Sequence, residues 1–93
     1  MDQPVKVRIR DSEYLIKGGE SEEQVYRIAA YVNEKLQEVQ ESAEGLSEKK
    51  TAILAALNIA SDYFRALRER DEILARYRSR TETLIYQIDQ VMR

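Results

Sequence analysis

The stretch of sequence that decides the fold runs from Ser47 to Arg93 and reads SEKKTAILAALNIASDYFRALRERDEILARYRSRTETLIYQIDQVMR. It contains neither Gly nor Pro, the two residues that most often interrupt a helix. At 1.5 Å per residue, a single helix over this stretch would be roughly 70 Å long. A compact domain of about 100 residues has a radius of gyration of only about 13 Å. We therefore expect a long C-terminal helix, part of which extends beyond the chain's own globular part.

Apolar residues repeat every seven positions along this predicted helix. Those at heptad positions a and d that we expect to carry oligomerisation are Leu57, Ala60, Phe64, Leu67, Leu74, Ile85 and Ile88. Position g adds further apolar side chains, among them Tyr63, Tyr77 and Leu84. A stripe wider than a strict a/d seam favours a bundle of more than two helices. Because a monomer would expose this stripe to water, we predict an oligomeric coiled coil.

Polar residues interrupt the predicted seam at Asp71, Arg78 and Thr81. In a parallel, in-register pair, each Asp71 would face its own copy and each Arg78 likewise. Like charges at core positions are costly. An antiparallel overlap centred near residue 76 would let opposite charges approach, and this arrangement is our hypothesis.

The N-terminal part predicts a β-hairpin over residues 4–17. Apolar and basic side chains alternate in the order Val5, Lys6, Val7, Arg8, Ile9, Arg10, which is typical of a half-buried strand. A second short run covers Glu13 to Lys17, and we expect Asp11 and Ser12 to form the turn between the runs. A lone hairpin is marginal in water, so another element must cover its apolar face.

An amphipathic helix over residues 21–41 is the expected cover. Ser21 is a candidate N-cap, and Gln24 follows it at capping-box spacing. Apolar residues then recur at helical spacing, at Val25, Ile28, Ala29, Val32, Leu36 and Val39. We predict an α+β fold: a head over residues 1–45, made of the small β-hairpin and this helix, followed by the long C-terminal helix over residues 46–93. The first part of the long helix should pack on the head, and the rest should form the coiled coil.

Composition excludes several classes of function. The 93 residues include 15 basic and 17 acidic side chains, and the net charge of −2 argues against binding to nucleic acid or a membrane by bulk attraction. No Cys and no His are present, which excludes disulfides, zinc sites built on these residues and His-dependent nucleophiles. We expect no enzymatic activity, no small-molecule substrate, no cofactor and no metal.

Targeting signals are also missing from the sequence. No apolar run approaches the roughly 20 residues needed to cross a bilayer. The first ten residues, MDQPVKVRIR, contain no apolar signal region. We therefore expect a cytoplasmic protein.

Three stretches together resemble the bacterial cell division protein ZapA family: VKVRIRDSEYLIKGG over residues 5–19, VNEKLQEV over residues 32–39 and AALNIASDYF over residues 55–64. The resemblance implies a non-catalytic scaffold that binds FtsZ, the tubulin-like GTPase. Such a scaffold cross-links or bundles FtsZ protofilaments and promotes Z-ring assembly and septation at mid-cell. It also implies paired heads in a homodimer, and two dimers joined through antiparallel long helices in a homotetramer.

The FtsZ-binding residues of the head are predicted from charge. The connection after the first helix, residues 41–44, reads Glu-Ser-Ala-Glu and departs from family members with a basic loop. We predict that five basic residues of the head and of the adjoining start of the long helix bind the partner, namely Arg8, Arg10, Lys17, Lys49 and Lys50. The alternative reading of the chain is a generic coiled-coil oligomerisation module or a nucleic-acid-binding module.

Overall fold

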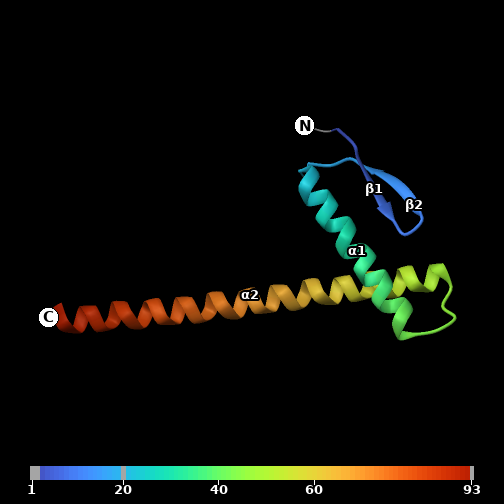
Figure 1. The fold of residues 1–93 in the computed structure, drawn as a ribbon. Helices are drawn as coiled ribbons and strands as arrows, with labels where there is room; N and C mark the ends of the chain where they lie inside the picture. Colours follow the sequence, from blue (N-terminus) through green and yellow to red (C-terminus); the bar gives the residue numbers. More distant parts are fainter. Residues whose placement is uncertain (1–2, 20, 93) are drawn as a thin grey trace. The chain divides into compact units, whose positions relative to one another are not determined.

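The computed structural model describes residues 3–19 and 21–92 (Figure 1). The elements follow one another as β1 (Val5–Ile9), β2 (Ser12–Ile16), α1 (Glu22–Ser42) and α2 (Glu48–Met92). The predicted α+β class, with a small hairpin, a first helix and a longer second helix, is confirmed. Four residues of the predicted ranges lie outside the described residues, namely Met1, Asp2, Glu20 and Arg93.

The hairpin is antiparallel, and its register corrects the predicted turn. Ile9 pairs with Ser12, so the turn consists of Arg10 and Asp11 rather than Asp11 and Ser12. Arg10 has φ of 56°, in the left-handed region that tight hairpin turns use and that non-glycine residues rarely adopt. The side chain of Asn33 bonds to the backbone at this turn. A contact from another element therefore supports the turn that local sequence did not indicate.

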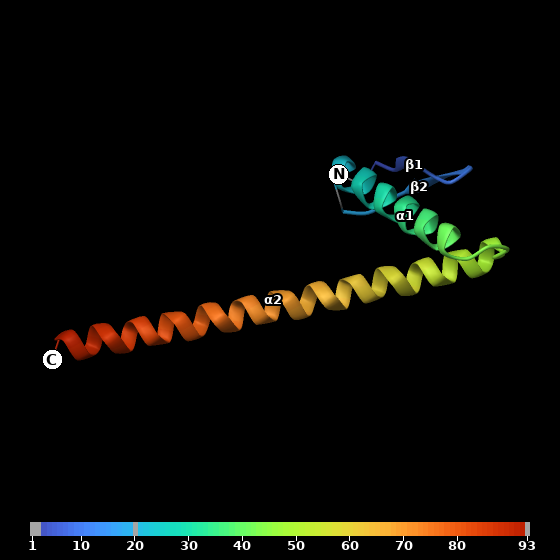
Figure 2. The same cartoon turned by 60° about the horizontal axis from the view of Figure 1, so that its bottom comes forward.

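Helix α1 covers β1, as the alternation of the strand requires. Figure 2 shows the hairpin lying along α1. Val7 of β1 and Val25 of α1 are both buried, at 5% exposure. Every residue of β2 is exposed, so the cover falls on one strand. Of the apolar positions predicted for α1, Ile28 is the exception, because 48% of it remains exposed.

The small core lies where α1 meets the first turns of α2. Leu36, Val39 and Ala55 are buried together, and Ile9, Val32 and Leu46 pack against them. Ala55 is only 2% exposed, so a larger side chain would not fit there without a shift of the helices. This cluster ties the hairpin, α1 and the start of α2 into one unit.

Side-chain caps begin both helices. The backbone N–H of Gln24 donates to Ser21 Oγ at 3.1 Å, which confirms the predicted N-cap of α1. The N–H of Lys50 donates to Ser47 Oγ at 3.1 Å at the start of α2. Gly45, in the connection between the helices, has φ of +74°, which glycine adopts without strain.

The chain divides into two compact units, of which the first ends at Ile59 and the second begins at Ala60. In the second unit, residues 60–92 are helical throughout, the yellow-to-red part of α2 in Figure 1. None of these residues is buried, and only Asp62 and Leu67 are half-buried. The predicted division of the chain at residues 45 and 46 stays a prediction.

Candidate interaction surfaces

The outer face of the hairpin carries part of the predicted cationic surface. Val7 points toward α1, so the alternation places Lys6 and Arg8 on the opposite, solvent-facing side. Lys6 Nζ lies 3.8 Å from the carboxylate of Glu13, and both side chains are at least half exposed. Exposed pairs of this kind add little stability. Arg8, opposite Glu13 in the register, is also exposed.

Arg10 is held differently from the other candidates. Its backbone N–H donates to Asn33 Oδ1 at 2.9 Å, and Asn33 Nδ2 donates to the backbone oxygen of Arg8 at 2.9 Å. The guanidinium Nη2 of Arg10 donates to Gln40 Oε1. The turn of the hairpin is thus bonded to α1 at both its backbone and its arginine side chain.

The remaining cationic candidates lie at different places in the first unit. Lys17 directly follows β2, at the end of the hairpin remote from the turn, roughly 17 Å away for five extended residues. Lys49 and Lys50 are exposed in the first turn of α2, where the helix dipole favours acidic side chains. Helix stability therefore does not explain these two lysines.

A hollow of about 200 Å³ connects the hairpin turn with the start of α2. Residues of the turn, including Arg10 and Asp11, line it together with Glu48 and Ala52. The fold therefore brings Arg10 toward the end of α2 that carries Lys49, and leaves Lys17 apart from it. The five cationic residues remain predicted binding residues.

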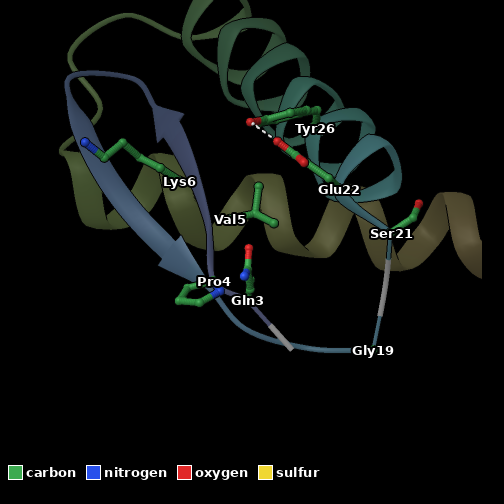
Figure 3. A pocket seen from close by; sticks show the side chains of 8 residues that line it. All are labelled: Gln3, Pro4, Val5, Lys6, Gly19, Ser21, Glu22 and Tyr26. Carbon is green, nitrogen blue, oxygen red and sulfur yellow. Dashed lines mark hydrogen bonds between the residues drawn. The ribbon is translucent and has the colours of Figure 1, made fainter. Parts of the chain in front are cut away.

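A larger open hollow, about 650 Å³, lies between the beginning of β1 and the beginning of α1 (Figure 3). Tyr26 Oη donates to Glu22 Oε1 at 2.9 Å on its α1 side. This hydrogen bond, with the negative charge of Glu22, raises the pKa of Tyr26 above its ordinary value.

Within residues 3–19 and 21–92 no group of three or more His, Cys, Asp or Glu side chains could hold a metal ion.

The second candidate surface is the apolar side of residues 60–92. Three seam residues, Phe64, Ile85 and Ile88, are more than half exposed, and Leu74 is 49% exposed. Ala60 is exposed and Leu67 half-buried. Residues 60–92 therefore present an apolar helical stripe whose side chains are mostly exposed. Covering such a stripe is what heptad interfaces do.

Leu57, the other predicted seam residue, belongs to the first unit. It is 63% exposed, and Ile53 and Leu54 beside it are also exposed. Thr51 and Ala55, on the other side of the same turns, are buried at 2%. The start of α2 thus has one face in the head core and one apolar face open.

Two of the polar residues that interrupt the seam, Asp71 and Thr81, have local contacts. Thr81 Oγ1 donates to the backbone oxygen of Tyr77 at 2.9 Å, so its hydroxyl needs no partner from another helix. Asp71 Oδ1 lies 3.5 Å from Arg70 Nη2, and both side chains are about two-thirds exposed. Asp71 would therefore enter an interface as a charge with only a weak local contact.

Neither helix of the described residues has an apolar window long enough to cross a bilayer.

Sequence reasoning missed Asn33 and Gln40. They stand seven residues apart on α1, two turns along one face, and Leu36 of the core lies between them. The available signal was two amides on the same helix face as a buried leucine, although Asn33 is only half-buried and Gln40 is exposed. That signal does not say which backbone the amides would meet.

The chain is similar in sequence to proteins of one known family. The family model of cell division protein ZapA matches residues 5–88. The cell division protein ZapA of Geobacillus thermodenitrificans (strain NG80-2) is 38% identical over 80 residues, which cover 83% of this chain and 88% of the relative. The one from Geobacillus kaustophilus (strain HTA426) is 40% identical over 65 residues, or 70% of this chain and 71% of the relative.

Solved structures show the same fold. A ZapA mutant dimer from Geobacillus stearothermophilus matches with a TM-score of 0.67 and 32% identity, over 84% of this chain and 91% of that one. An unknown conserved bacterial protein from Pseudomonas aeruginosa PAO1 matches with a TM-score of 0.71 and 26% identity, over 94% of this chain and 97% of that one.

Proposed function

The chain belongs to the ZapA family of cell division proteins, and from this membership we propose that it binds FtsZ and cross-links or bundles FtsZ protofilaments. The observation that carries the proposal is the family match over residues 5–88, which includes the hairpin, α1 and most of α2. The proposed place of action is the cytoplasm at mid-cell, where cross-linking would promote Z-ring assembly.

The proposal includes a homo-oligomer built from pairs of heads and from antiparallel long helices, a dimer of dimers. The apolar stripe of residues 60–92 supports it, since the described residues of one chain leave Phe64, Ile85 and Ile88 open to water. The similar structure from Geobacillus stearothermophilus is a dimer. Antiparallel helices would also bring Asp71 of one copy toward Arg78 of another rather than toward its own equivalent.

Cross-linking follows from the number of heads in one assembly. A single head can bind a filament weakly, and a second head in the same assembly then binds at a high effective concentration. Avidity therefore rises without any additional contact per head. The proposed role needs no bond-making chemistry in this chain, and we propose that it is not an enzyme.

Co-sedimentation with GTP-polymerised FtsZ tests the proposal, with negative-stain images of the pellets. The informative variant is Ile85→Glu, which puts a charge on the apolar stripe of residues 60–92. Thr83→Glu is the matched control, because it adds the same charge at a position predicted to face away from the seam. We expect the parent and Thr83→Glu to pellet with bundled filaments, and Ile85→Glu to bind without bundling.

Two results would contradict the proposal. If the parent stays in the supernatant at moderate salt, FtsZ binding is wrong and only an oligomerisation module remains. If Ile85→Glu bundles filaments as well as the parent does, cross-linking does not depend on the apolar stripe.

A further inference from the structure

Arg10 differs from other cationic side chains of the described residues in its partner. Carboxylates lie within 4 Å of several of these cations, in the pairs Lys6–Glu13, Lys35–Glu38, Arg65–Asp62 and Arg70–Asp71. The guanidinium of Arg10 instead donates to the neutral amide oxygen of Gln40. Asp11 and Glu48 line the same hollow as Arg10, but among the described residues neither forms an ion pair with it.

A neutral anchor has a specific physical consequence. A carboxylate partner would hold the guanidinium and also cancel its charge, whereas an amide oxygen holds it and leaves the positive charge in place. One of the five N–H donors of an arginine is used by Gln40, and the others stay available. A guanidinium held in this way suits bidentate binding of a carboxylate.

The anchor also lowers the entropic cost of binding. An exposed arginine loses rotamer freedom when a partner immobilises it, which weakens binding by roughly two- to tenfold. Here the backbone of Arg10 is already held by Asn33, and its guanidinium is already held by Gln40. Both contacts come from α1, across 23 and 30 residues of sequence. The rigid helix, rather than the turn itself, determines where the charge lies.

We propose that Arg10 is a specificity-determining contact to an acidic side chain of FtsZ, and that Gln40 is the positioning residue that holds its guanidinium without neutralising it. Asn33 supports the same geometry through the turn backbone. This inference rests on the proposed function and adds to it a chemical class of contact, carboxylate to guanidinium, at one end of the hairpin. It selects Arg10 from the five cationic candidates as the one that the fold has pre-organised.

The test is the affinity of the full chain for fluorescently labelled, unpolymerised FtsZ, measured by anisotropy at several salt concentrations. Arg10→Ala should weaken binding roughly tenfold or more, as expected for losing a hydrogen-bonded charge. Gln40→Ala should weaken it roughly two- to tenfold, the equivalent of the rotamer entropy given above. Gln37→Ala is the matched control, since it removes an exposed glutamine from α1 and should leave binding unchanged.

Two further variants separate positioning from a structural role. Gln40→Glu replaces the amide with a carboxylate, so it should keep thermal stability while weakening FtsZ binding and lowering its salt dependence. In an Arg10→Ala background, Gln40→Ala should have no additional effect on binding, because there is no guanidinium left to hold. Circular dichroism and thermal unfolding of each variant establish that the head is folded.

The outcomes are distinguishable. Equal affinity of Gln40→Glu and the parent, or additive effects of Arg10→Ala and Gln40→Ala, would overturn the role of Gln40. Unchanged affinity of a folded Arg10→Ala variant would overturn the whole inference and leave the proposed function standing. A parent chain that does not bind FtsZ would overturn the proposed function, and this inference with it.

Discussion

The head and residues 60–92 reach a defined structure by different means. In the head, Val7, Val25 and the Leu36 cluster bury apolar surface within one chain. In residues 60–92 the helix is regular, but none of its residues is buried. Both regions have apolar side chains at helical spacing. The difference is that the first region buries apolar side chains itself, whereas the apolar side chains of residues 60–92 are exposed, and we propose that another chain covers them.

Two regions with the same spacing of apolar residues can therefore differ in whether they are stable without another chain. Most helical stability in proteins comes from packing of an apolar face rather than from intrinsic propensity. The head should therefore keep its fold when assembly is lost, while residues 60–92 should lose helix.

The largest effect is expected from Ile88→Glu in the second region. An uncompensated charge in an apolar interface costs about 3–5 kcal/mol per site. Assembly should therefore weaken, and the helix of residues 60–92 should fray. Sedimentation equilibrium would report a smaller mass, and far-UV circular dichroism a loss of helical signal. Gln90→Glu is the control, predicted to face away from the seam. An unchanged mass for Ile88→Glu would show that this stripe is not the interface.

In the head, Leu36→Ala should lower the free energy of unfolding by about 2–5 kcal/mol, because it leaves a cavity between α1 and its neighbours. Leu36 is 7% exposed and belongs to the core cluster. Leu15→Ala is the matched control: Leu15 is 66% exposed, and its change should stay within about 0.5 kcal/mol. Urea unfolding measures both. Similar costs for the two leucines would mean that the head lacks the core described above.

Asp71→Leu should strengthen the second region while loosening its specificity. Replacing a charge in an interface by an apolar residue of similar volume is often stabilising, by about 1–4 kcal/mol. The same replacement removes the charge that disfavours other registers, so mixed stoichiometries should appear. Thermal unfolding measures the gain, and light scattering measures the assemblies. A single assembly of unchanged mass would refute a register role for Asp71.

A smaller effect is expected at the start of α1. Ser21→Ala removes the oxygen that accepts the N–H of Gln24, and should cost about 0.5–2 kcal/mol of head stability. Ser21→Asn should restore most of it, because asparagine is also a good N-cap. Urea unfolding of the three proteins gives the comparison. Equal stabilities would mean that water replaces the cap without loss.

The smallest effect concerns Tyr26. Its hydrogen bond to Glu22 and the charge of that carboxylate raise the pKa of Tyr26. A pKa that is raised in the folded state stabilises the fold below the unfolded pKa, and this contribution is lost as pH rises through the folded value. It is therefore complete at neutral pH and disappears only in strongly alkaline solution. Ultraviolet titration should show the pKa of Tyr26 falling in Glu22→Gln, with Tyr26→Phe identifying its signal. No change would show that Glu22 does not act on Tyr26.

Much of the fold could be predicted because its signals are local. The alternation from Val5 to Ile9 predicts a strand, and Ser21 predicts the start of α1 within one residue. The absence of Gly and Pro after Ser47 predicts one uninterrupted helix, which the structure has over Glu48–Met92. The exposed seam of residues 60–92 followed from the same heptad spacing. Each of these inferences depends on neighbours within a few residues along the chain.

Of the candidate surfaces, the apolar stripe was visible in the sequence, while the organisation of the cationic residues was not. Charge selected Arg8, Arg10, Lys17, Lys49 and Lys50 without ranking them. The predicted hairpin already separated Lys17 from Arg10, but nothing in the spacing of these residues indicated that Asn33 and Gln40 of α1 would bond to Arg10.

Local patterns therefore predicted the types of the elements and their limits to within a residue or two, and they also predict that residues 60–92 need a cover from another chain. Only the tertiary structure decided that the hairpin turns at Arg10 and Asp11, and that Asn33 and Gln40 hold Arg10. The reason is the distance along the chain over which each kind of interaction acts. Periodicity and caps act over one or two turns, whereas the bonds to Arg10 join residues 23 and 30 positions apart and exist only once α1 has packed on the hairpin.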